Sequence, residues 1–155
     1  MDGLNWISTE STHQYITLEN YTEKQQNLEN ATITMEVVEK FVRDEVKFEK
    51  GIPTITFYIV LELNILEIIQ QNDNISNSDI KMTPKLLQAI SDKAKQQFCY
   101  SVNKLKNDNT DVVNAYQLLN SKEHKKFQKM LKNLNNPEEY LKYVQFRMDI
   151  VAGLT

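Results

Sequence analysis

The sequence predicts an all-α protein, a single-domain bundle of five to seven helices around a hydrophobic central helix. Two observations favour this fold class. Glycine and proline, with three of each in 155 residues, are too few for a loop-rich fold. Four segments after residue 80 repeat apolar side chains every three or four residues, which is the spacing of a helix face. The alternative is an α+β fold with a β-hairpin near residues 46–63.

The first part of the chain differs in composition from the rest. Residues 1–31 are polar, with scattered apolar side chains such as Trp6, Tyr15 and Leu28. Disordered segments are usually poor in aromatic residues. We therefore expect residues 1–31 to form an arm or short elements packed on the core, with Trp6 docked. Residues 32–155 are expected to form the helical bundle domain.

Two apolar segments lie between the arm and residue 80. Residues 34–50 place their apolar side chains mostly at helical spacing, so we expect a helix that ends at Gly51. Residues 54–71 fit two structures. Their first half alternates apolar and polar side chains as a strand does, whereas their length and the apolar run at 65–69 suit a helix that is buried on nearly all sides. We predict the central helix here, and the hairpin remains the alternative.

The second half of the chain carries the helix start signals. Thr83 before Pro84 pairs a capping residue with proline at the first helical position. Asn136 before Pro137, with Glu139 placed to complete a capping box, is the strongest start signal. The helices expected in this half cover residues 83–105, 111–119, 121–134 and 136–151. The side chains expected in the core are Phe57, Leu61, Ile65, Ile68, Leu87, Ile90, Phe98, Val102, Leu131 and Val144.

Composition argues against several kinds of site. Cys99 is the only cysteine, so neither a disulfide nor a thiolate zinc cluster is expected. His13 and His124 are far apart and do not form a two-histidine metal motif. We therefore expect no catalytic residue, no metal and no cofactor. Residues 1–6 lack the features of a secretory signal and no segment is apolar enough for a membrane, so we expect an intracellular protein, cytoplasmic or nuclear, without a membrane partner.

Charge indicates the candidate binding surface. Residues 80–155 carry 13 basic and 7 acidic side chains, and five of the lysines recur at three- and four-residue intervals along the helix expected at 121–134. The helix expected after Pro137 carries more aromatic surface than one core-facing stripe needs, which is typical of a protein interface. The residues expected to bind a partner are Lys122, Lys125, Lys126, Lys129, Lys132, Tyr140, Tyr143 and Phe146.

These features predict a non-catalytic protein-protein interaction module or adaptor whose partner has an acidic surface. The abundance of lysine, asparagine and isoleucine is typical of an AT-rich genome, and a virus-encoded binder of a host protein is a specific form of this prediction. The first alternative is a nucleic-acid-associated factor that uses the lysine-rich helix. The acidic pI of about 5.5 and the presence of only two arginines disfavour it. The second alternative is a small enzyme with no recognisable motif.

Overall fold

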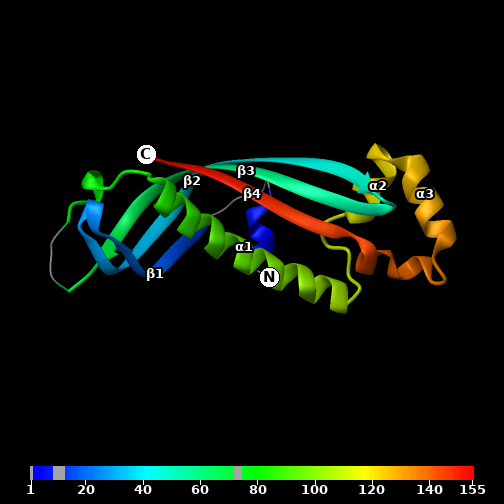
Figure 1. Cartoon of the computed structure of the whole chain (residues 1–155), viewed down its shortest axis with the longest axis horizontal. Coiled ribbons are helices and arrows are strands. Elements are labelled where there is room, and N and C mark those ends of the chain that lie inside the picture. Colours follow the sequence, from blue (N-terminus) through cyan, green and yellow to red (C-terminus); the bar gives the residue numbers. More distant parts are fainter. Residues whose placement is uncertain (1, 9–12, 72–74) are drawn as a thin grey trace.

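The fold is α+β, and the expectation of an all-α bundle is wrong. A computed structural model describes residues 2–8, 13–71 and 75–155, and in these residues one four-stranded sheet has the order β1-β2-β3-β4. Figure 1 shows an elongated molecule in which α1 runs along one side of the sheet and α2 and α3 lie at one end. The elements in chain order are η1 (Asp2–Trp6), β1 (Tyr15–Glu23), η2 (Lys24–Gln26), β2 (Leu28–Glu49), β3 (Ile52–Ile69), η3 (Asn77–Asp79), α1 (Pro84–Asn107), α2 (Ala115–Lys122), α3 (His124–Asn133), η4 (Pro137–Tyr143) and β4 (Gln145–Leu154).

A long hairpin of β2 and β3 replaces the two helices expected before residue 80. The strands are 22 and 18 residues long, and the turn between them places Lys50 and Gly51 at φ 52° and 79°. Two consecutive positive φ angles match the tight turn whose twist suits a hairpin. Residues 52–69 form a strand, in agreement with the alternation of their apolar side chains. Many of these side chains are β-branched or aromatic, and such side chains pack well on a sheet. The hairpin alternative near residues 46–63 was right in kind but too short.

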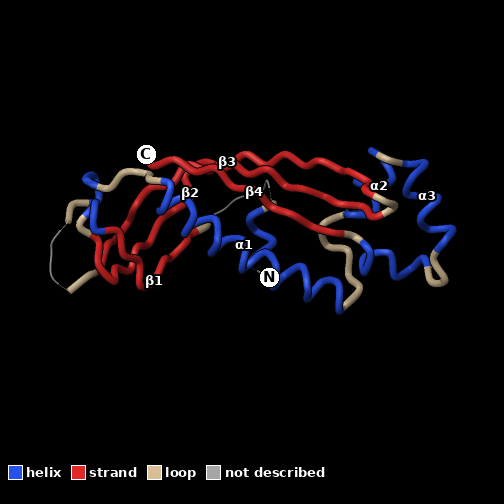
Figure 2. Tube along the Cα trace, in the orientation of Figure 1, coloured by secondary structure: helices blue, strands red, loops and turns tan. Residues whose placement is uncertain are grey.

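The two outer strands pair with different halves of this hairpin. β1 is antiparallel to the first part of β2, from Leu28 to Glu36, whereas β4 is parallel to β3 from Thr54 to Leu63. Figure 2 shows the result, a long twisted layer of strands with its outer strands displaced toward opposite ends. β1 falls within the expected N-terminal arm.

The last expected helix, residues 136–151, is instead a short 3-10 segment followed by β4. η4 begins at Pro137 as the start signal indicates, but it contains a kink at Glu139 and ends at Tyr143. Beyond it, Met148, Ile150 and Ala152 are buried and the residues between them are exposed. This two-residue period is that of a strand. Pairing with β3 therefore overrides the helical spacing of these side chains.

Helix α1 confirms the clearest prediction after residue 80. The Thr83 hydroxyl oxygen accepts a hydrogen bond from the Leu86 amide at 3.1 Å, as expected of a capping residue before proline. One face of the helix packs on the sheet, where Phe98 meets Phe57 edge to face with ring centroids 6.1 Å apart. Seven expected core side chains are buried, namely Phe57, Leu61, Ile65, Ile90, Phe98, Val102 and Val144. Three are half-buried and pack against them, namely Ile68, Leu87 and Leu131.

The first residues dock on α1, as expected for Trp6. Its side chain is 1% exposed and its indole Nε1 donates to Gln97 Oε1 at 2.9 Å. Residues 9–12 of the expected arm lie outside the described residues. Within the part of the chain that the structure describes, no helix is long and apolar enough to cross a membrane.

Candidate partner-binding groove

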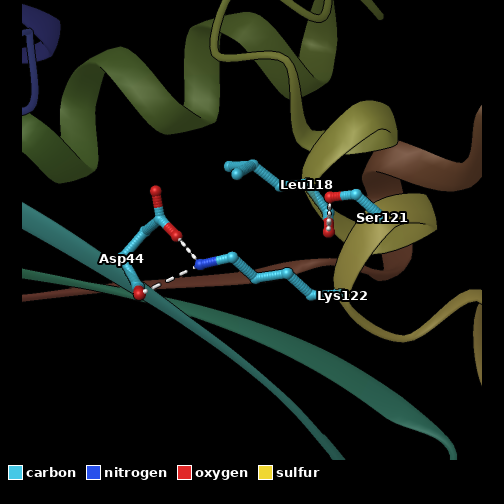
Figure 3. A network of polar contacts seen from close by, with 4 residues as sticks. All are labelled: Asp44, Leu118, Ser121 and Lys122. Atoms are coloured by element: carbon cyan, nitrogen blue, oxygen red, sulfur yellow. Dashed lines mark hydrogen bonds and ion pairs between the residues drawn. The ribbon is translucent and has the colours of Figure 1, made fainter.

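The structure separates the five lysines that were expected on one helix. Lys122 ends α2, and α3 begins only at His124, because Glu123 between them leaves the helical conformation at φ −139°. The helix expected at 121–134 does not begin at Ser121, which lies inside α2 and donates its hydroxyl to the Leu118 carbonyl oxygen at 3.2 Å. Figure 3 shows the Lys122 ammonium directed at Asp44 of β2, where it contacts both the carboxylate and the backbone carbonyl. Lys122 therefore contacts β2 and does not lie beside the other four lysines.

The other four lysines are exposed on one broad side of α3. Phe127, on the packed side of the helix, is fully buried. Successive residues are rotated by about 100° around a helix, so the four lysines lie within an arc of about 120°, and only part of this arc borders a groove. Lys126 and Lys129 line a groove, whereas Lys125 and Lys132 do not.

This groove lies between α3, the tip of the β2–β3 hairpin and the junction of η4 with β4. It has a volume of about 690 Å³. Its apolar lining comes mainly from the hairpin tip, from α3 and from the residues before β4, namely Phe48, Ile52, Pro53, Met130, Leu134, Tyr143 and Val144. Its charged lining consists of four lysines, namely Lys106, Lys126, Lys129 and Lys142. We call it the lysine-rimmed groove.

The lysines of the groove differ in their surroundings. Burial lowers the pKa of Lys106, whose ammonium lies 5.7 Å from the centre of the Phe146 ring. Lys126 is 3.8 Å from a Glu123 oxygen and Lys142 is 2.9 Å from a Glu139 oxygen. Among the described residues Lys129 forms no ion pair. The groove therefore has an excess of positive charge next to apolar side chains.

The three aromatic residues expected to bind a partner have different positions. Tyr140 packs edge to face against Tyr116 and Phe127, with ring centroids 5.5 and 6.1 Å away, and its hydroxyl donates to Asp111. It therefore supports the packing of α2 and α3. Phe146 is half-buried beneath Lys106. Tyr143 is 50% exposed and lines the groove.

Sequence reasoning missed part of the groove, because its wall comes from segments far apart in the chain. Lys106 and Lys142 belong to other elements, and Ile52 belongs to a hairpin that was considered only as an alternative. The turn at Gly51 was the one local signal for this hairpin tip. Together these side chains suit a segment that carries both acidic and apolar residues.

Other features of the surface are less suited to binding. A hollow of about 760 Å³ at the opposite end of the hairpin is lined mainly by asparagine, glutamine and other polar side chains, including Asn20, Asn27, Asn30, Gln70 and Gln71. It lacks aromatic residues in its lining and has no concentration of one charge. Within the described ranges, no group of three His, Cys, Asp or Glu side chains is placed to hold a metal ion.

Nearly the whole chain matches one protein family. Residues 1–152 match the family model described as "Spore germination B3/ GerAC like, C-terminal". The chain belongs to this family. The match includes the sheet, α1 and the lysine-rimmed groove.

A solved structure shares the fold of this GerAC-like domain. It is titled "Crystal Structure of the GerBC protein", and its TM-score to this chain is 0.73 at 17% sequence identity. The likeness covers 99% of this chain and 44% of the GerBC chain. The chain therefore corresponds in length to less than half of that protein. The search of curated proteins found no match.

Family membership corrects the functional expectations. The predicted interaction module or adaptor, in the form of a virus-encoded binder of a host protein, is wrong, because the matched family is one of spore germination. The match also gives no support to the two alternatives, a nucleic-acid-associated factor and a small enzyme. The abundance of lysine, asparagine and isoleucine therefore does not indicate a virus. The expected cytoplasmic or nuclear location is wrong for the same reason.

Proposed function

We propose that this chain is a domain of a spore germination receptor subunit and that it holds another protein of the receptor through the lysine-rimmed groove. The observation that carries the proposal is the family match over residues 1–152. The shared fold with GerBC agrees with it. In this proposal the domain is not catalytic, and it acts by binding at the spore's inner membrane.

The lining of the groove favours a protein partner that presents both apolar and acidic side chains. The exposed ring of Tyr143 can serve as an anchor, since aromatic side chains dominate binding energy at interfaces. The charges of Lys126 and Lys129 would attract carboxylates and speed association. The partner segment would therefore carry an apolar side chain that enters the lysine-rimmed groove and acidic residues that face its lysines.

Variants of the groove in spores test this function. We expect Tyr143→Ala and Lys129→Glu to slow germination in a strain whose only copy carries the change, because one removes the anchor and the other reverses a charge in the groove. Lys125→Glu is the matched control, since Lys125 lies on the same helix outside the groove. The readouts are the rate of germination and the amount of the protein in the spores. Equal germination of all three variants at equal protein levels would contradict a role for the groove.

Photo-cross-linking identifies the partner directly. A photoreactive phenylalanine analogue at position 143 is expected to cross-link to another receptor protein. The same analogue at position 100 is the control, because Tyr100 on α1 is 74% exposed but does not line the groove. Equal cross-linking from both positions, or cross-linking to lipid alone, would show that the groove does not hold a receptor protein. Normal germination of a strain that lacks the gene would contradict the receptor role itself.

A further inference from the structure

The sheet has a second face that none of the described elements covers. In β3 the side chains from Ile55 to Leu63 alternate between a buried side, where α1 packs, and an opposite side that is exposed or half-exposed. On this opposite side Phe41, Val60 and Val151 are register partners in β2, β3 and β4. They are 67%, 49% and 60% exposed. We call this side of the sheet the open face.

The three apolar side chains form one row across the strands. Neighbouring strands lie about 4.8 Å apart, so a row over three strands is about 10 Å wide. An α-helix with its side chains has a diameter of about 10 Å. Sheets commonly bury their apolar faces against helices. The row therefore has the width that one packed helix needs.

The next row on the open face is acidic. Glu39 and Glu62 are register partners in β2 and β3, and both are exposed. Neither forms an ion pair within the part of the chain that the structure describes. Like charges directly opposite each other in a sheet are destabilising. A positively charged group from outside would relieve this repulsion.

Gly153 occupies the β4 position of the acidic row and contributes no side chain to it. It is the register partner of Glu62 in β4, and a Cβ atom added to it would meet nothing within 4 Å. No side chain of β4 therefore neutralises Glu62 from this position. On the other side of the apolar row, by contrast, Arg43 lies 4.8 Å above the Tyr58 ring and balances the charge of Asp149, the register partner of Tyr58 in β4. The excess of negative charge is thus confined to one flank of the apolar row.

We infer that the open face binds a basic amphipathic helix of another protein, whose apolar stripe packs on Phe41, Val60 and Val151 and whose lysine or arginine side chains reach Glu39 and Glu62. A second copy of this chain does not supply such a helix. Its lysine-rich helix α3 already buries Phe127 and packs Met130 and Leu131 in its own core. An anionic membrane is repelled by the two carboxylates. This surface is separate from the lysine-rimmed groove and does not depend on the function proposed for it.

A titration of the full chain with two synthetic helical peptides tests the inference. Both peptides are about 18 residues long, which favours helix formation, and share a leucine stripe. One carries lysines beside the stripe and the other carries glutamates. We expect the lysine peptide to bind about tenfold more tightly and to shift the backbone amide NMR signals of residues 39–41, 60–62 and 151–153. Equal affinity for both peptides, binding of neither, or shifts at other residues would overturn the inference.

Variants of the open face sharpen the test. Phe41→Ser and Gly153→Lys are each expected to weaken the lysine peptide about tenfold without changing the melting temperature, because both positions are exposed. Gly153→Ala is the control and should bind as the unchanged chain does. Full binding by Gly153→Lys would overturn the role of Glu62.

Two further measurements distinguish other occupants. Phosphatidylglycerol vesicles that shift the same amide signals more strongly than the lysine peptide would identify a membrane and overturn the inference. A dimer in light scattering that Phe41→Ser abolishes would identify a second copy and overturn it as well. We expect neither result.

Discussion

The hydroxyl of Thr83 donates a hydrogen bond to Glu23 Oε1 at 3.0 Å, and this contact joins the end of β1 to the start of α1. The same hydroxyl oxygen caps the helix by accepting from the Leu86 amide. Glu23, which is only 6% exposed, also accepts from the Tyr21 hydroxyl at 2.8 Å and from Gln26 Nε2 at 2.6 Å. One buried carboxylate thus connects a strand, a turn and a helix cap.

Replacing this carboxylate with an amide is expected to lower stability. Glu23→Gln should reduce the free energy of unfolding by about 1 to 3 kcal/mol at neutral pH, because buried donors lose their charged acceptor. Urea unfolding followed by circular dichroism measures this change. The control is Glu29→Gln, since Glu29 is exposed. An equal loss of unfolding free energy in both variants would show that the buried carboxylate of Glu23 does not stabilise the fold more than an exposed one.

The same group predicts a pH dependence. Burial raises the pKa of Glu23, but hydrogen bonds from Gln26, Thr83 and Tyr21 lower it by more, so its net pKa lies below the ordinary value. Its stabilising effect is therefore complete above the unfolded pKa of about 4.3 and is lost as the pH falls through the lower folded pKa. Glu23→Gln should lose less stability than the unchanged chain over this acidic range. Parallel unfolding curves at a series of pH values check the difference.

Gly3 is expected to tolerate no side chain. A Cβ atom at this position would lie 2.0 Å from the carbonyl oxygen of Gln97. Gly3→Ala should therefore push η1 away from α1, lower stability by about 1 to 3 kcal/mol and expose Trp6. A red shift of tryptophan fluorescence in the native state reports the exposure. Gly153→Ala, where the added Cβ meets open space, should leave both stability and fluorescence unchanged.

The Tyr140 hydroxyl is expected to stabilise the junction of α2, α3 and η4. It donates to Asp111, whose carboxylate also accepts from the backbone amides of Ala115 and Tyr116 at 2.7 and 2.9 Å. Tyr140→Phe should cost about 1.5 to 3 kcal/mol, as for a hydrogen bond to a charged group. The control is Tyr143→Phe at a half-exposed ring. Thermal melts of equal midpoint for both variants would contradict this role.

Alkaline pH should act on the same tyrosine. Burial raises the pKa of Tyr140, and the hydrogen bond to Asp111 and its charge raise it further. The stabilisation is therefore present below the unfolded pKa of about 10 and is lost as the pH rises through the higher folded pKa. Tyr140→Phe should lose less stability than the unchanged chain on this alkaline limb.

The ion pair between Asp44 and Lys122 is expected to contribute little. Both side chains are partly exposed, at 31% and 43%. A double-mutant cycle with Asp44→Asn and Lys122→Met should give a coupling free energy below about 1 kcal/mol that decreases further in high salt. A larger coupling that resists salt would show that this contact holds α2 on the sheet more strongly than exposed pairs do.

The sequence predicted α1 well because its signals are local. Thr83 and Pro84 start the helix, and its apolar residues repeat over many turns without interruption. The same reasoning failed for β2 and β3, because their apolar side chains occur on both sides of each strand. Phe41 and Val60 belong to the side that α1 does not cover. Without knowledge of that uncovered side, the extra apolar residues resemble those of a buried helix.

The sequence by itself determined the starts of α1 and η4, the burial of seven expected core side chains and the excess of lysine near the C-terminus. Only the tertiary structure decided that β4 runs beside β3, because their partners Phe146 and Ile55 lie far apart in the chain and no local pattern encodes that pairing. It also brought Ile52 and Lys106 to Lys129 and Tyr143, and so made the lysine-rimmed groove. A helix start depends on neighbouring residues, whereas a sheet and a groove depend on contacts between distant segments.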